Sequence, residues 1–361
     1  MARVLPALAL LGGCLVTYGC GPSSFWPRHF QDTLAGSKAF SETPLPPRDL
    51  PMFDGRGGLV LDWADLMEAI RQADVVVVGE THTDAAGHKV ELAIVQDVLE
   101  RWAGSAVSME MLVREDQAAA DEYVAGKIDE AEFVKRTHTA DWAGKGTWQK
   151  WYHPITATAR VAGGRLVAAN APRKYADLAR KQGYDALEQL PEAERKLFDI
   201  PQWATRGGYY RRFREAMKEH VPPPKPEAKS KAEEKPKREE KAKPDEKAKT
   251  AGKPPGKPEQ KKEPHRPLTG ADIKAMFRSQ QLWDATMAGS ILRATAQAGT
   301  PKVVHLAGGF HSEFDGGLIQ RIRRGNPDLT LLTISLQPLH SRRLRSEDRG
   351  RADVVVYTGG N

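Results

Sequence analysis

Four consecutive valines, at residues 75–78, run directly into the polar segment GETHTD at 79–84. A run of β-branched residues without polar alternation is typical of a strand buried on both faces, as in a parallel sheet. We expect further strands over residues 105–112, 165–173, 302–309, 329–336 and 352–359, with helices between most of them. This alternation predicts an α/β fold, in which helices cover both faces of a mostly parallel sheet.

A long polar segment interrupts this alternation between two predicted helices. Residues 222–268 are rich in Lys, Glu, Pro and Ala and contain no aromatic residue. Such a segment cannot bury enough apolar surface to offset the loss of chain entropy on folding. We therefore predict a single α/β domain over residues 57–221 and 269–361, with a disordered basic insert at 222–268.

The excess positive charge of the chain lies in this insert. The net charge is +7, and residues 225–266 contribute 15 Lys/Arg and 9 Asp/Glu, which leaves the rest at about +1. A nearly neutral domain gives no electrostatic reason to expect a nucleic-acid partner. The aromatic and basic segment at 207–214 (GGYYRRFR) has no nucleic-acid motif around it, so we attribute it to packing and solvent.

The first twenty residues have the composition of an export signal. One basic residue, Arg3, precedes an apolar stretch and several small residues. A cysteine after such a stretch predicts cleavage and lipidation at Cys20, with Cys14 as the other position and an uncleaved anchor as the alternative. Residues 21–56 are rich in Pro, Ser and Gly, so we expect them to tether the domain to a membrane.

Polar side chains follow four of the predicted strands, and in open parallel sheets ligands bind at these strand ends. Two of the four ends share the pattern Gly-x-x-His, at residues 79–82 and 308–311. Imidazole and carboxylate groups together form a recognised site for divalent metals, whereas imidazole and phenolate are also ligands of haem iron. The candidate metal ligands are Glu80, His82, Glu110 and His311.

Three further segments bear on this site. Arg173, after Asn170 and Pro172, offers a forked donor to a carboxylate or phosphate, such as a haem propionate, unless it pairs with an acid of the fold. The aromatic residues around Tyr152 are interpreted as core more readily than as a cofactor wall. Asp284 lies in the apolar stripe of a predicted helix and needs a partner, so we expect it to orient a histidine or arginine of the site.

Several segments together resemble the ChaN-type haem-binding uptake lipoproteins, which belong with the Tiki/TraB and erythromycin-esterase-like proteins. They are GETHTD, SMEML, QKWYHPI, AANAPRKYADLARKQG, WDATMA and HLAGGFHSEFDGG, and they cover about residues 57–340 without the insert. The resemblance implies an α/β fold, attachment to the outer membrane and a role in iron acquisition, with haem held partly by a tyrosine that matches Tyr152. The haem-binding residues are then His82, Tyr152, Asn170, Arg173 and His311.

Two classes of function remain open from the sequence. The first is a surface lipoprotein that binds haem or an iron compound without turnover, with a haem receptor and a second copy of the chain (a homodimer) as partners. The second is a metal-dependent hydrolase, peptidase- or esterase-like, with zinc or manganese. In that case Glu80, His82 and Glu110 would be catalytic, and Glu80 or Glu110 would act as base on a metal-bound water.

Overall fold

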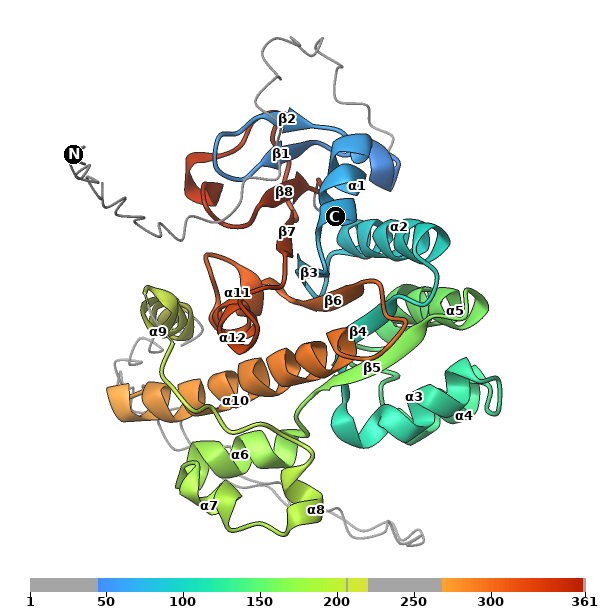
Figure 1. Cartoon of the computed structure of the whole chain (residues 1–361). Coiled ribbons are helices and arrows are strands. Elements are labelled where there is room, and N and C mark those ends of the chain that lie inside the picture. The colour runs from blue at the N-terminus through green and yellow to red at the C-terminus, as the bar shows by residue number, and fades with distance from the viewer. Residues whose placement is uncertain (1–44, 206, 220–267, 360–361) are drawn as a thin grey trace, which may run out of the picture.

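One sheet of eight strands forms the centre of the part of the chain that the computed structural model describes, residues 45–205, 207–219 and 268–359 (Figure 1). The strand order is β2-β1-β8-β7-β3-β6-β4-β5. Neighbouring strands from β8 to β5 are parallel, whereas β1 pairs antiparallel with both β8 and β2. The predicted mostly parallel α/β sheet is therefore confirmed. The strands are β1 (Met52–Asp54), β2 (Val60–Leu61), β3 (Val75–Glu80), β4 (Ala106–Val113), β5 (Arg165–Asn170), β6 (Val303–Gly308), β7 (Leu331–Gln337) and β8 (Val354–Tyr357).

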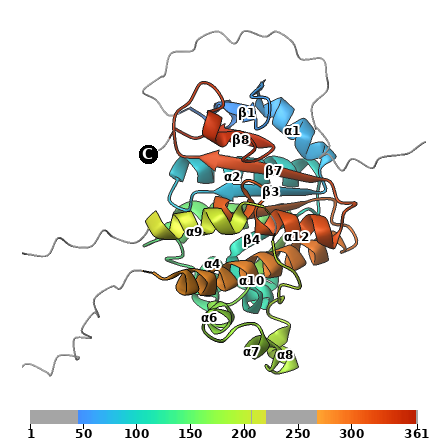
Figure 2. The ribbon, with the colours of Figure 1, turned by 90° about the vertical axis from the view of Figure 1, so that its left-hand side faces the viewer.

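Helices cover both faces of this sheet, as the sequence predicts. One face packs against α1 (Trp63–Gln72), α2 (Ala85–Arg101), α3 (Gln117–Val124), α4 (Glu130–Thr137) and α5 (His153–Val161). The other face packs against α10 (Gly270–Thr295) and α12 (Gly317–Gly325), which lie side by side (Figure 2). The remaining helices are α6 (Arg173–Gln182), α7 (Asp185–Glu188), α8 (Glu192–Arg195), α9 (Tyr209–Glu219) and α11 (Gly309–Ser312).

The valine run behaves as its composition predicts. Val76 and Val78 pack into the core beneath α2, whereas Val75 and Val77 pack into the core beneath α10 and α12. All four side chains are fully buried. The lack of polar alternation in β3 thus follows from burial on both faces of the sheet.

The structure changes two of the predicted boundaries. Met52 and Phe53 are buried in β1, which pairs with β8, so the predicted tether over 21–56 does not extend to residue 56. The predicted strand over 165–173 ends at Asn170, because Pro172 caps α6 and Arg173 is already its first helical residue. The predicted signal segment with Cys20 and the disorder of the insert fall outside the described residues. The insert lies between α9 and α10, two helices, as expected.

The order of the strands reverses at the carboxyl ends of β3 and β6. These two strands are neighbours, but the chain leaves β3 towards β4 and leaves β6 towards β7, on the opposite side. Such a reversal of strand order is where ligands bind in open α/β sheets. Among the described residues, no helix is long and apolar enough to cross a membrane.

Candidate functional site

The two Gly-x-x-His segments pack directly against each other at this reversal. Glu80, the last residue of β3, pairs in register with Gly308, the last residue of β6. A Cβ atom at Gly308 would lie 2.9 Å from Nε2 of His82, and one at Gly79 would lie 2.7 Å from Oγ of Ser312. Both positions therefore need glycine because a methyl group would separate the segments, and the imidazole of His82 rests on the backbone of Gly308.

The two ring nitrogens of His82 have different surroundings: Nδ1 contacts Glu80, whereas Nε2 has no hydrogen-bond partner among the described residues. Its Nδ1 lies 2.5 Å from Oε1 of Glu80, and its ring meets the ring of Trp142 edge-on at a centroid distance of 4.8 Å. Its side chain is 40% exposed, and its Nε2 makes no hydrogen bond with the described residues. Burial lowers the pKa of His82, but the hydrogen bond to Glu80 and the charge of Glu110 outweigh burial and raise it. His82 is thus an oriented imidazole with Nε2 available to a ligand.

Glu80 connects this histidine to the interior. Its Oε1 also accepts a hydrogen bond from the hydroxyl of Tyr152 at 2.9 Å, and its Oε2 lies 3.4 Å from Nδ1 of His88. Burial, and then the negative charge of Glu91, raise the pKa of Glu80 to about 8. Tyr152, at the end of a π-helical turn (Trp148–Tyr152), is fully buried, and burial and Glu80 raise its pKa well above the usual range. Its oxygen therefore faces Glu80 and not the solvent.

His88 and Glu91 extend the site into helix α2, and the sequence analysis did not identify them. Nδ1 of His88 lies 2.8 Å from Oε2 of Glu91, and the imidazole stacks on Trp151 with centroids 4.6 Å apart. Both side chains are buried. The signal for them was a histidine and a glutamate three residues apart on the apolar side of a helix, where neither belongs without a partner.

A second chain of buried polar groups begins at Glu110 in β4, the residue after the last pairing of β4 with β6 at Met109. Its Oε2 accepts the backbone N–H of Gly308 at 2.7 Å, and its Oε1 lies 3.5 Å from Nε2 of His311. Nδ1 of His311 lies 2.6 Å from Asp284, whose other oxygen accepts the hydroxyl of Tyr209 at 2.7 Å. Asp284 thus has the histidine partner that the sequence analysis expected, His311.

The charges in this chain stabilise one another. Burial lowers the pKa of His311, but the negative charges of Glu110 and Asp284 outweigh it and raise the pKa to about 10. Burial raises the pKa of Glu110, but His311 outweighs it and lowers the pKa to about 2. At neutral pH the site therefore contains an imidazolium between two carboxylates, with both imidazole nitrogens already engaged.

Asn170 and Arg173 have different surroundings. The amide of Asn170 donates to the backbone carbonyl of Glu110 at 3.2 Å and accepts from the N–H of Ala171 at 2.8 Å, so it braces the ends of β4 and β5. Arg173 is exposed and makes no polar contact with the described residues. The predicted residues thus form two contact groups that meet at Gly308, one of Glu80, His82 and Tyr152 and one of Glu110, His311 and Asn170. Arg173 belongs to neither group.

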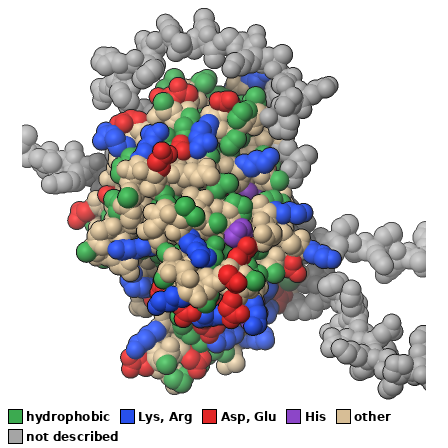
Figure 3. Space-filling view, turned by 90° about the vertical axis from the view of Figure 1, so that its right-hand side faces the viewer, with side chains coloured by type: hydrophobic (Ala, Val, Ile, Leu, Met, Phe, Trp, Pro, Cys, Tyr) green, Lys and Arg blue, Asp and Glu red, His purple; other side chains and the backbone are tan. Residues whose placement is uncertain are grey.

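The surface around the helices of the first face carries mixed charge. On the face shown in Figure 3, Lys/Arg and Asp/Glu side chains are interspersed, and histidine side chains reach the surface among them. The described residues on this face thus offer no single continuous block of one charge.

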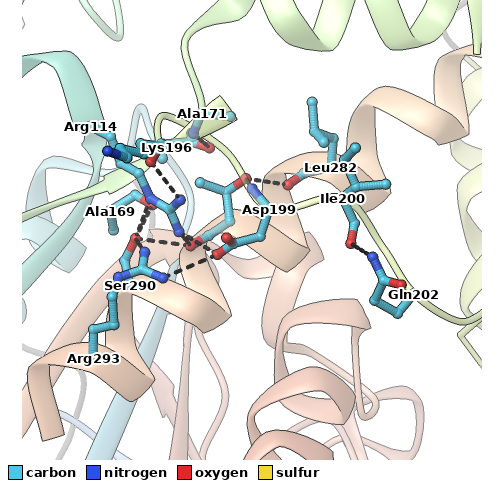
Figure 4. Close-up of polar contacts among 12 residues, drawn as sticks. Arg114, Ala169, Ala171, Lys196, Asp199, Ile200, Gln202, Leu282, Ser290 and Arg293 are labelled. Carbon is cyan, nitrogen blue, oxygen red and sulfur yellow. Dashed lines mark hydrogen bonds and ion pairs between the residues drawn. The ribbon is translucent and has the colours of Figure 1, made fainter. Parts of the chain in front are cut away.

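A cavity of about 520 Å³ lies elsewhere, between α3, α10 and the first part of β5. Beside it, Arg114 contacts Asp199 at 2.5 Å and Ser290 at 3.0 Å, and Arg293 contacts Asp199 at 3.4 Å (Figure 4). Because these contacts already pair Arg114 and Arg293, and because none of the predicted site residues lines the cavity, we place the functional site at the strand ends.

Comparison with protein families gives a match over most of the chain. Residues 66–322 match a family described as haem-binding uptake, Tiki superfamily, ChaN. No curated protein sequence matches the chain significantly.

Solved structures give matches at low sequence identity. The structure described as cofacial heme binding to ChaN of Campylobacter jejuni is 15% identical, with a TM-score of 0.53, over 86% of this chain and 96% of that one. The type III effector HopBA1 is 12% identical, with a TM-score of 0.44, over 88% of this chain and 99% of that one. A mutant of the erythromycin esterase EreC in its open conformation is 12% identical, with a TM-score of 0.40, over 80% of this chain and 78% of that one. The first of these shares the fold.

Proposed function

This chain belongs to the ChaN family of haem-binding uptake proteins in the Tiki superfamily, and from that premise we propose that it binds haem through His82. The observation that carries the proposal is the state of this imidazole. Its Nδ1 is fixed by Glu80, while its Nε2 has no hydrogen-bond partner in the part of the chain that the structure describes, on a side chain that is 40% exposed. Histidines that ligate metals commonly have their second nitrogen held by a carboxylate in this way, which orients the ring and increases its basicity.

Two residues suit a flat, doubly acidic ligand: Trp142, which contacts His82, and Arg173, which follows the end of β5. The rings of Trp142 and His82 are nearly perpendicular with centroids 4.8 Å apart, so an aromatic side chain adjoins the imidazole. Arg173 is exposed at the first turn of α6, and its planar guanidinium matches a carboxylate in bidentate fashion. We assign Arg173 to a propionate of the bound haem.

The other predicted iron ligands fit less well. The oxygen of Tyr152 is fully buried and donates to Glu80, and its pKa is raised, so phenolate is disfavoured. Both ring nitrogens of His311 face acids. We therefore propose that Tyr152 and His311 position the groups around His82 and do not bind iron.

The proposed cellular role rests on the N-terminal segment of the sequence and on the family. We propose that Cys20 is lipidated, that the protein is anchored in the outer membrane, and that it passes haem to or from a haem receptor during iron acquisition. Because His82 is partly exposed, we propose that a second copy of the chain would help to enclose the ligand in a homodimer.

The test of haem binding is an absorption titration. Haemin added to the purified protein should give a Soret band that shifts and saturates, and His82→Ala should weaken binding by at least about tenfold, which is about 1.4 kcal/mol. His138→Asn is the control because His138 is an exposed histidine in a left-handed conformation that asparagine tolerates. Equal titrations for His82→Ala and the wild type would show that His82 is not the ligand.

The anchor needs a separate test. Cys20→Ser should release the protein from membranes into the soluble fraction, whereas Cys14→Ser, the matched control, should leave it membrane-associated. Membrane association of both variants would rule out Cys20 as the lipidated residue.

The hydrolase alternative has weaker support from the same residues. With a pKa of about 2, Glu110 is too weak a base to accept a proton readily at neutral pH. Glu80 has a pKa of about 8, but its oxygens face the buried groups Tyr152 and His88. Turnover of an ester or peptide by the zinc- or manganese-loaded protein, with no Soret shift, would favour this alternative.

A further inference from the structure

We propose that Glu80, His88 and Glu91 form a closed binding site for a divalent transition-metal ion, distinct from the haem position at His82. Each of the three residues offers one ligand atom, and these atoms lie within 4.8 Å of one another. All three side chains are buried, with residue exposures of 5%, 3% and 0%. The site lies behind His82, on the interior side of Glu80.

The hydrogen bond at Nε2 of His88 determines whether Nδ1 carries a hydrogen or a lone pair. Its Nε2 lies 3.2 Å from the backbone carbonyl oxygen of His82, and a carbonyl can only accept, so Nε2 carries the hydrogen. In the neutral imidazole Nδ1 then presents a lone pair, 2.8 Å from Oε2 of Glu91 and 3.4 Å from Oε2 of Glu80. Three electron-pair donors thus point at one another, and a cation or bound protons must lie between them.

Two carboxylate oxygens in this group have no other partner. Oε2 of Glu80 and Oε1 of Glu91 are buried without a hydrogen bond to the described residues. A protonated His88 could donate through Nδ1 to only one carboxylate. Because an unpaired buried carboxylate is costly, the metal-free state must hold protons there. A divalent cation would replace those protons and satisfy both oxygens.

The surroundings match those of a metal ligand set. His88 donates its second ring N–H to a carbonyl, which fixes its tautomer, and Oε1 of Glu80 is held by Tyr152 and His82. His88 and Glu91 are three residues apart on α2 and so share one face of the helix. Trp151 stacks on His88 at 4.6 Å and covers it.

The ligand types indicate the class of ion. One imidazole nitrogen and two carboxylate oxygens suit zinc, manganese or ferrous iron. The ligands are almost fully buried, so the ion would be structural. Through Oε1 of Glu80 it would also fix the position of His82, which couples the metal to the outer site without placing it there.

The test uses the metal alone, without haem, so its result is independent of the haem proposal. Chelator-treated wild-type protein is titrated with Zn²⁺ and, separately, Mn²⁺ by calorimetry, and bound metal is counted after dialysis. We expect about one ion per chain and a higher melting temperature. The isosteric Glu91→Gln should lose more than about 100-fold in affinity, since removing even an outer partner of a ligand costs about 10–100-fold.

The control is Glu130→Gln, which removes the carboxylate from another acid–histidine pair, 2.9 Å from His153, outside this group. It should bind metal as the wild type does. For zinc-loaded wild type, X-ray absorption should show nitrogen and oxygen ligands at about 2.0–2.2 Å with imidazole scattering, a readout that needs no variant to fold. The proposal is overturned if the wild type binds neither ion, if the bound ion lacks imidazole scattering, or if folded Glu91→Gln binds it equally well.

Discussion

Replacing Gly308 by alanine would place a methyl group 2.9 Å from Cε1 and Nε2 of His82 and 3.6 Å from Oε2 of Glu110. Gly308 has φ −54° and ψ 134°, which alanine adopts freely, so the whole effect is steric. Carbon contacts are comfortable at about 3.5–4.0 Å, so the imidazole must retreat by roughly 0.6 Å or more. Because His82 is partly exposed, it can move, and we expect a loss of about 1 kcal/mol in the free energy of unfolding, the low end for overpacking.

The displacement should have a larger effect on the ligand than on the fold. A retreating ring disturbs the 2.5 Å contact with Glu80 that orients it, so we expect Gly308→Ala to weaken haemin binding by about tenfold. Gly79→Ala is the matched control. Its methyl would meet the backbone Cα of Gly309 at 3.0 Å, which cannot move aside, so it should cost about 2–3 kcal/mol of stability.

Urea unfolding measures the free energy of unfolding of each variant, and haemin titration of the folded protein measures its affinity for haemin. We expect Gly79→Ala to lose more stability than Gly308→Ala, and Gly308→Ala to lose more haemin affinity than Gly79→Ala. If Gly308→Ala binds haemin as tightly as the wild type, the proposed position of the ligand beside residue 308 is wrong.

Three further predictions concern the buried polar groups. Asp284→Ala should lower the free energy of unfolding by about 3–5 kcal/mol in urea, because it leaves the imidazolium of His311 buried with one partner fewer; a loss below about 1 kcal/mol would contradict the ion pair. Tyr152→Phe should cost about 1–2 kcal/mol through the lost hydrogen bond to Glu80 and leave haemin affinity unchanged in a titration, whereas a large loss of affinity would make the tyrosine a ligand. The free energy of unfolding should fall at both high and low pH. The pKa of His311 rises from 6.5 to about 10 on folding, so its contribution to stability is full below pH 6.5 and is lost as pH rises through 10. The pKa of Glu110 falls from 4.5 to about 2, so its contribution is full above pH 4.5 and is lost as pH falls through 2. His311→Asn should flatten both limbs in chemical unfolding measured across this range, and an unchanged profile would refute the assignment.

Local patterns in the sequence were sufficient for the centre of the fold. The valine run identified β3 because burial on both faces leaves no polar position, and the rule on strand ends placed Glu80, Glu110 and His311 together. Strand β1 could not be predicted from local pattern, since it is three residues long and is defined by its pairing with β8.

The parts of the site that were not predicted depend on contacts between distant segments. Asp284 was predictable because an acid in an apolar helix stripe must have a partner. The same argument applies to His88 and Glu91. They were not identified because the segment was interpreted only from the helical spacing of its apolar residues. Tyr209 lies in a segment attributed to packing and solvent, and its hydrogen bond to Asp284 crosses 75 residues, so no local pattern could reveal it.

The account depends most on which side chain holds haem iron. The direct measurement is the resonance Raman and electron paramagnetic resonance spectrum of the haemin-loaded wild type beside His82→Ala and Tyr152→Phe. We predict an imidazole-ligated iron in the wild type and in Tyr152→Phe, and loss of that signature in His82→Ala. A phenolate-ligated iron in the wild type that disappears in Tyr152→Phe would contradict the proposal and would require Tyr152 to leave Glu80 when haem binds.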